Sequence, residues 1–140
     1  MAKTAKAFVF IDTSFFKALL DERDDFHQEA IRVWQRLQAE NVSLVTSNFI
    51  LDEVFTLIRK RGGVNKVREL RQLLINNASG LKIILVTATD EAEAWNWFLK
   101  DWRDLSFTDF VSFTLMERLE LKRVATFDHH FSQAVFKVEE

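Results

Sequence analysis

The chain has 140 residues, of which 48% are hydrophobic and 29% are charged, and its formal net charge is -2. This length fits one domain, taken here as residues 1–140, and the composition excludes a disordered tail. The chain contains no Cys, which excludes disulfides, thiolate metal sites and cysteine nucleophiles, and its small negative charge argues against broad, charge-driven binding to nucleic acid.

The first predicted element is the apolar run of residues 7–11 (AFVFI), which suits a strand buried on both faces. The run is too short for a membrane span and meets an acid at once, so we expect no signal peptide and a cytoplasmic location. It ends in Asp12, which is followed by Thr13 and Ser14. Because ligands of an open parallel sheet bind at the carboxyl ends of its strands, Asp12 is the first candidate for chemistry.

Helical and strand-like patterns alternate through the next part of the chain. We expect helices over residues 14–20, 25–39, 49–61 and 65–76, and a strand over residues 43–46. Gly62 and Gly63 separate the last two helices. The helix over 25–39 has a predicted buried stripe made of Phe26, Ala30, Val33, Trp34 and Leu37.

The same alternation continues to the C-terminal end. We expect a buried strand over 82–86, a helix over 90–100 capped by Thr87 or Thr89, a helix from Ser106 or Thr108 to 119, a strand over 123–127 and a short edge strand over 136–138. Strands that alternate with helices, with no tight hairpin signal, predict a three-layer α/β/α domain with a central, largely parallel sheet.

The helix over 49–61 carries two neighbouring acids in different sectors. At about 100° per residue, Glu53 falls between Phe49 and Leu57, inside the apolar sector, whereas Asp52 falls outside it. A buried carboxylate needs a cation or a set of hydrogen bonds, so Glu53 is a candidate ligand. The alternative is an inward-leaning glutamate with a basic partner or a wet edge.

Two further acids occupy comparable places. Asp109 lies on the core side of its helix, although Ser106 and Asp109 also have the spacing of a capping box. Asp128 directly follows an apolar strand, as Asp12 does, although a turn or cap role is common for Asp. Four carboxylates in one cleft would repel one another without cations, and hard oxygen ligands favour Mg²⁺ or Mn²⁺. Such a site suits phosphodiester hydrolysis.

Four segments resemble the PIN-domain ribonucleases, a family that includes the VapC toxins of toxin–antitoxin pairs. They are FIDTSFFKALL, TSNFILDEVFTLI, LSFTDFVSFTLMERL and RVATFDHHF, in the family's order and over nearly the whole chain. The resemblance implies metal-dependent endonucleolytic cleavage of single-stranded RNA by metal-activated water, leaving a 3′-hydroxyl and a 5′-phosphate. It also implies an antitoxin protein as a partner and a homodimer.

The resemblance carries the family's acidic roles onto Asp12, Glu53, Asp109 and Asp128, with Asp128 binding the metal directly or through water. It further implies that Thr13, Ser14 and Thr126 brace the carboxylates or the metal-bound water.

Other residues have competing interpretations. The basic residues Arg59, Lys60 and Arg61 follow Glu53 on its helix and either hold RNA backbone or form a solvated face. His129 and His130 are interpreted as substrate contacts beside Asp128 in preference to zinc ligands. The stripe of Trp95, Phe98, Leu99 and Trp102 is typical of a core or a dimer interface, and Trp97 lies off this stripe as a surface candidate.

Two rival functions remain open on the sequence. Asp12 is also a candidate nucleophile of an aspartyl phosphotransfer domain, although such enzymes carry a second Asp where this chain has Ser14. The other rival is an RNA-binding or adaptor domain that keeps the fold without turnover. The presence of all four acids argues against it.

Overall fold

The computed structural model describes residues 7–134 and 136–140; the first six residues, part of the segment for which we expect no signal peptide, lie outside this description. Its elements in chain order are β1 (Phe8–Ile11), α1 (Thr13–Leu20), α2 (His27–Glu40), β2 (Ser43–Ser47), α3 (Asn48–Asn76), β3 (Leu81–Ile84), α4 (Ala88–Phe98), α5 (Phe107–Arg118), β4 (Arg123–Ala125), α6 (His130–Gln133) and β5 (Lys137–Val138). The predicted order of strands and helices is confirmed, with boundaries shifted by a few residues, except that the sequence does not predict the short helix α6.

The strands form one parallel sheet in the order β3-β2-β1-β4-β5. The chain moves outward from β1 to β2 and β3, then returns through α4 and α5 to place β4 on the other side of β1. The strand order therefore reverses between β1 and β4, and this switch point is where open α/β sheets bind ligands.

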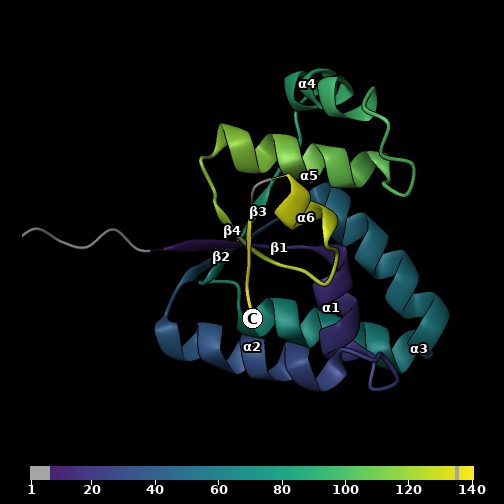
Figure 1. The fold of residues 1–140 in the computed structure, drawn as a ribbon. Coiled ribbons are helices and arrows are strands. Elements are labelled where there is room, and N and C mark those ends of the chain that lie inside the picture. Colours follow the sequence, from purple (N-terminus) through teal and green to yellow (C-terminus); the bar gives the residue numbers. More distant parts are fainter. Residues whose placement is uncertain (1–6, 135) are drawn as a thin grey trace, which may run out of the picture.

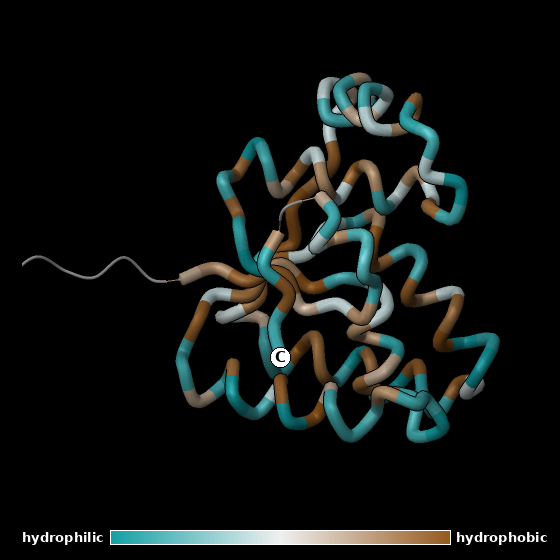
Figure 2. The backbone as a smooth tube through the Cα atoms, viewed as in Figure 1, coloured by the Kyte–Doolittle hydropathy of each residue, from teal (hydrophilic) through white to brown (hydrophobic). Residues whose placement is uncertain are grey.

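Helices cover both faces of the sheet. α1, α2 and the second half of α3 lie on one side, and α5, with α4 outside it, lies on the other (Figure 1). Figure 2 shows hydrophobic residues concentrated in the central strands and hydrophilic residues along the outer helix faces. Phe10, Ile11 and Val124 are completely buried, as expected for parallel strands covered on both faces. The predicted three-layer α/β/α fold is confirmed.

The helix α3 bends at Gly63. The sequence predicts two helices separated by Gly62 and Gly63, and the structure confirms two helical halves of α3 that meet in a kink at Gly63, with φ of 69° and ψ of -168°. A positive φ is readily available to Gly because it lacks a Cβ. Figure 1 shows the first half of α3 descending from the sheet and the second half returning beneath it.

The predicted caps resolve to one residue in each case. Thr87 caps α4 by accepting a hydrogen bond from the Asp90 backbone N–H, and Ser106 caps α5 in the same way through Asp109. Asn41 ends α2 in the left-handed conformation, with φ of 57°, a conformation that Asn tolerates better than most residues.

Two predictions of burial are wrong, one because the strand lies at the edge of the sheet and one because the residue precedes its helix. The strand expected to be buried over 82–86 is β3, the edge of the sheet, so Ile83 is 48% exposed and Leu85 is 70% exposed. Phe26 is 46% exposed because α2 begins after it, and it stands outside the regular helical stripe.

The aromatic stripe around α4 is not a core stripe as a whole. Trp95, Phe98 and Leu99 are exposed, whereas Trp102 is partly buried against the core; the alternative of a dimer interface stays a prediction. Trp97, expected at the surface, is half-buried, and its ring meets Phe113 of α5 edge to face at 5.2 Å. The reason is that α4 packs against α5 through the face carrying Asp90, Ala94 and Trp97.

Within the described residues, no helix combines the length and apolar character needed to span a membrane.

Candidate active site

The candidate site lies at the carboxyl ends of β1 and β4. Asp12 follows β1 directly and is the N-terminal cap residue of α1, and Thr126 follows β4 directly. The Asp12 backbone N–H donates a hydrogen bond of 3.1 Å to the Ala125 carbonyl, which ties the two strand ends together. The switch point of the sheet therefore coincides with the first acid singled out from the sequence.

The Asp12 carboxylate is fixed through one oxygen only. Its Oδ2 accepts hydrogen bonds from Ser14 Oγ at 3.0 Å and Thr126 Oγ1 at 2.8 Å. Its Oδ1 is buried and has no hydrogen-bond partner among the described residues. Burial, and secondly the charge of Asp109, raise the pKa of Asp12 to about 7. Such an orphaned anionic oxygen needs a cation or a proton.

Glu53 reaches the same region from α3. Ser47 caps this helix by accepting from the Ile50 backbone N–H at 3.1 Å, which sets the helix phase directly after β2. Glu53 is half-buried while its neighbour Asp52 is exposed, as their sectors predict. Thr13 Oγ1 donates a hydrogen bond of 2.8 Å to Glu53 Oε1. The residue after Asp12 thus holds the second acid in place.

Asp109 both caps α5 and faces the other acids. Its Oδ2 accepts from the Ser106 backbone N–H at 2.9 Å, so the capping box exists. Burial raises the pKa of Asp109 above its usual value; hydrogen bonds from Ser106 oppose this, and the nearby charges of Asp128 and Glu53 add to it. The two interpretations of Asp109 are therefore compatible.

Asp128 is held in a turn before α6. Its backbone N–H donates to Thr126 Oγ1 at 3.0 Å, and its Oδ1 accepts from the His130 backbone N–H at 2.9 Å. His130 Nδ1 lies 2.7 Å from the same oxygen. The sequence placed His130 near Asp128 but gave no signal for this direct contact, which depends on the local turn.

The hydroxyl residues connect these acids into one network. Ser14 Oγ lies 3.0 Å from Thr126 Oγ1 and also accepts from the Phe127 backbone N–H at 2.9 Å. Thr126 in turn links Asp12 to the Asp128 backbone. Thr13, Ser14 and Thr126 therefore occupy positions suited to the bracing role that the resemblance implies.

The donor set fits a hard divalent cation. Among the described residues, Asp12, Glu53 and Asp109 have no ion-pair partner, although acids elsewhere in the fold do. Carboxylate oxygens are the ligands that Mg²⁺ and Mn²⁺ prefer, and the free Asp12 Oδ1 supplies a fixed one. The pKa values of Asp12 and Asp109 are raised partly by neighbouring carboxylates, Asp109 in the first case and Asp128 and Glu53 in the second.

The acids are nevertheless not drawn together tightly. Within the described parts of the chain, the only group of three or more His, Asp or Glu residues whose potential ligand atoms all lie within 4.8 Å of one another is Asp128, His129 and His130. Its two histidines, His129 and His130, are interpreted on the sequence as substrate contacts in preference to zinc ligands. In the structure one of its members, His130, is already engaged by Asp128.

A cleft of about 700 Å³ lies beside Glu53, along the first turns of α3. Its lining includes Glu53, Phe55 and Thr108, so it opens on the site from the side of α5. Arg59 and Lys60 are exposed farther along α3, and Arg61 is exposed and paired with Asp21. The three basic residues are thus accessible, and only Arg61 has an ion-pair partner among the described residues.

Comparison with known proteins gives a consistent result. A family model for the PIN domain matches residues 9–137. The 23S rRNA-specific endonuclease VapC20 of Mycobacterium tuberculosis is 33% identical over 129 residues, covering 91% of this chain and 95% of the relative.

Two solved structures share the architecture. The crystal structure of Mycobacterium tuberculosis VapC20, a sarcin-ricin loop cleaving toxin, gives a TM-score of 0.80 at 32% identity and covers 91% of this chain and 95% of its own. VapBC2 from Rickettsia felis, bound to a DNA fragment from the promoter, gives a TM-score of 0.69 at 15% identity and covers 94% and 97%. At that identity the second likeness concerns the fold alone.

Proposed function

This chain belongs to the PIN-domain family, and from that premise we propose that it is a metal-dependent endoribonuclease that cuts single-stranded RNA. The observation that carries the proposal is the meeting of Asp12, Glu53, Asp109 and Asp128 at one end of the sheet, with no basic side chain paired to the first three among the described residues. A stable fold has little reason to gather such acids unless a cation joins them.

In this proposal Asp12, Glu53 and Asp109 hold Mg²⁺ or Mn²⁺, and Asp128 completes the set directly or through water. When bound, the ion supplies an activated water and offsets the charge that develops on the phosphate. Ser14 and Thr126 keep the Asp12 carboxylate in one orientation, and Thr13 does the same for Glu53. No side chain has to act as a nucleophile, and the products carry a 3′-hydroxyl and a 5′-phosphate.

Basic residues near the site would hold the RNA backbone. We assign this role to Arg59, Lys60 and Arg61, which follow Glu53 on α3 and are exposed. Contacts of this kind neutralise phosphates and make the affinity depend on salt.

The biological setting proposed is that of a toxin in a toxin–antitoxin pair, acting in the cytoplasm as a single PIN-like nuclease domain over residues 1–140. The relative VapC20 is a 23S rRNA-specific endonuclease, and its structure is that of a toxin that cleaves the sarcin-ricin loop. A cognate antitoxin and a second copy of the chain are the expected protein partners. The exposed apolar side chains at the end of α4, Trp95, Phe98 and the following Leu99, are available for such a contact.

The test is RNA cleavage by matched variants. We expect wild-type protein to cut single-stranded RNA with Mg²⁺ or Mn²⁺ and not with EDTA, and Asp12→Asn and Glu53→Gln to lose cutting by about 100-fold or more. Glu91→Gln is the matched control for Glu53→Gln, because Glu91 is exposed on α4 and lines neither cleft beside the acids. Equal cutting by wild type and Asp12→Asn would defeat the assignment.

The two rival functions predict different results for the same protein. An adaptor domain would bind RNA without cutting it under any metal condition. An aspartyl phosphotransfer domain would form a phospho-aspartate on Asp12, which mass spectrometry detects. The buried Asp12 carboxylate, with one oxygen taken by two hydroxyls, favours a fixed ligand over an accessible nucleophile.

A further inference from the structure

A second cleft, of about 340 Å³, opens beside the carboxylates on the side opposite α5, between α1, the loop before α2 and the end of the first half of α3. We propose that it seats one unpaired nucleotide of the RNA, with the base stacked on Phe26 and the phosphate bound by Arg61. The proposal rests on the proposed function, since it names a binding position for the same substrate.

The cleft shares residues with the candidate site. Ser14 lines it and also donates to the Asp12 carboxylate at 3.0 Å. Phe127 lines it too, and its backbone N–H donates to Ser14 while the next residue is Asp128. A nucleotide in this cleft would therefore lie directly next to the phosphate held at the acids.

Three parallel phenyl rings run from the core to this cleft. Phe15 is buried and stacks on Phe127, with ring centroids 5.9 Å apart and planes 9° apart. Phe127 stacks in turn on Phe26 at 4.6 Å and 8°. Phe26 is 46% exposed, so the column ends with an aromatic ring in solvent. An unpaired base extends such a column, because every base has a face that stacks on an aromatic ring.

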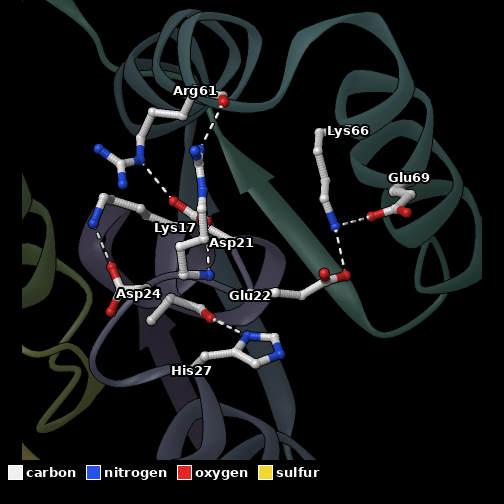
Figure 3. A network of polar contacts seen from close by, with 10 residues as sticks. Lys17, Asp21, Glu22, Asp24, His27, Arg61, Lys66 and Glu69 are labelled. Atoms are coloured by element: carbon white, nitrogen blue, oxygen red, sulfur yellow. Dashed lines mark hydrogen bonds and ion pairs between the residues drawn. The ribbon is translucent and has the colours of Figure 1, made fainter.

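The Arg61 guanidinium is oriented for an anion. Its Nε donates to Asp21 Oδ2 at 2.6 Å, and Figure 3 shows its two terminal nitrogens pointing away from that carboxylate. Within residues 7–134 and 136–140, neither Nη atom has a hydrogen-bond acceptor. Asp21 thus fixes the side chain and leaves the Nη pair, which matches the geometry of a phosphate.

The remaining charges of the cleft are partly balanced. Lys17 is paired with Asp24, as Figure 3 shows, and Arg23 Nη2 donates to the Arg61 carbonyl at 2.8 Å. These contacts explain how α1 and the following loop are tied to α3. They do not explain an exposed phenyl ring beside the acids. Because Asp24 and Asp25 also line the cleft, stacking contributes more to the affinity than net charge does.

The experiment measures binding of a fluorescent, unstructured RNA oligomer by anisotropy, with Mg²⁺ present and with Asp12→Asn as the parent chain, so that the RNA is not consumed. We expect Phe26→Ala and Phe26→Leu to weaken binding by about tenfold, and Phe26→Trp to bind within about twofold of the parent. The matched control is Phe8→Ala, because Phe8 is 38% exposed and lies at the other end of β1. It should bind within about twofold of the parent.

Two further probes separate the base from the phosphate. An oligomer of the same length without bases should bind the parent and Phe26→Ala equally. Arg61→Gln should reduce the slope of log affinity against log salt by about 0.7, the value for one phosphate contact on a single strand. Arg71→Gln, exposed on the second half of α3, should leave the slope unchanged.

Each outcome decides one proposal. Unchanged RNA affinity of Phe26→Ala and Phe26→Leu, or an equal loss with the baseless oligomer, would overturn the stacking position. Melting temperatures of all variants within a few degrees of the parent exclude misfolding as the cause, and Phe26→Leu keeps the apolar bulk against Phe127 for that reason. Failure of the wild-type chain to cut RNA would overturn the proposed function instead, because cutting is read in a separate assay.

Discussion

The helices α4 and α5 begin with the same motif and use its acid differently. In α4 the Thr87 backbone N–H donates to Asp90 Oδ2 at 3.0 Å, and in α5 the Ser106 backbone N–H donates to Asp109 Oδ2 at 2.9 Å. Both acids also lose solvent on folding. The local sequence pattern of a capping box therefore does not distinguish them.

The difference lies in what the rest of the fold supplies. Arg118 donates to both carboxylate oxygens of Asp90, at 2.7 and 3.1 Å. Burial alone raises the pKa of Asp90, but the hydrogen bonds from Thr87 and Arg118 outweigh it and leave that pKa below its usual value. Asp109 has no such cation, and its pKa is raised by burial and by the charges of Asp128 and Glu53. A buried acid without a counter-ion marks the site better than its helix position does.

The largest expected effect is on RNA cleavage, when the two capping acids, Asp109 and Asp90, are each replaced by Asn. Asp109→Asn should lower kcat/KM for RNA cleavage by about 100-fold or more, because the amide keeps the cap but not the charge. Asp90→Asn should leave cleavage within about twofold. Kinetics with Mg²⁺ check both variants. If both lose activity equally, the distinction between the acids is wrong.

The pH dependence of stability should report the unpaired acids in metal-free protein. The pKa of Asp12 is raised from 3.8 to about 7, so the folded chain keeps a proton that the unfolded chain has released. The protonated Asp12 therefore contributes to the free energy of unfolding in full below about pH 4, and this contribution is lost as the pH rises through 7. The loss in the free energy of unfolding between pH 5 and 7 is about 2–3 kcal/mol. Denaturant unfolding in EDTA measures this loss, and Asp12→Asn should flatten the curve. Parallel curves for the two proteins would contradict the raised pKa.

Asp90, the acid paired with Arg118, should matter more for stability than Asp109, although it matters less for RNA cleavage. Asp90→Asn leaves Arg118 without its buried partner, and we expect a loss of about 1–3 kcal/mol in the free energy of unfolding. Asp109→Asn removes an uncompensated charge and should cost less than Asp90→Asn. Denaturant unfolding at pH 7 compares the two. A larger loss for Asp109→Asn would reverse the conclusion drawn from the counter-ions.

The smallest expected effect on RNA cleavage comes from removing a hydroxyl that donates a hydrogen bond to Asp12. Ser14→Ala removes one donor to Asp12 and the acceptor of the Phe127 N–H, and we expect about a tenfold loss of kcat/KM. Ser132→Ala is the matched control, since its Oγ donates only to the His129 carbonyl. An effect of the same size in both variants would rule out a specific role for Ser14.

Sequence reasoning succeeds where the signal is periodic or local. The helical phase separates Glu53 from Asp52, and the end of an apolar run locates Asp12. The same reasoning places Asp109 on the core side without its electrostatic surroundings. The family resemblance, confirmed by the PIN model over residues 9–137, supplies the order in which the acids meet. Their role as metal ligands stays a prediction.

What the sequence does not contain is the contacts between distant residues. Arg118, which neutralises Asp90, is 28 positions away, and nothing local marks the pair. The column of Phe15, Phe127 and Phe26 joins a helix, a turn after β4 and a loop. Trp97 turns inward because α4 packs on α5 at that face, where its ring meets Phe113 and Trp102. Such features depend on the assembled layers and not on spacing.

The kink at Gly63 divides the four candidate acids between two parts of the chain. Gly62 and Gly63 are exposed, and the backbone leaves the helical path at Gly63. A chain cut at this point would yield one fragment carrying Asp12 and Glu53 and another carrying Asp109 and Asp128. Neither fragment alone has the full set of acids, so RNA cutting would return only when the two reassociate. The bend thus offers a split point for a reconstituted enzyme whose activity reports the meeting of its halves.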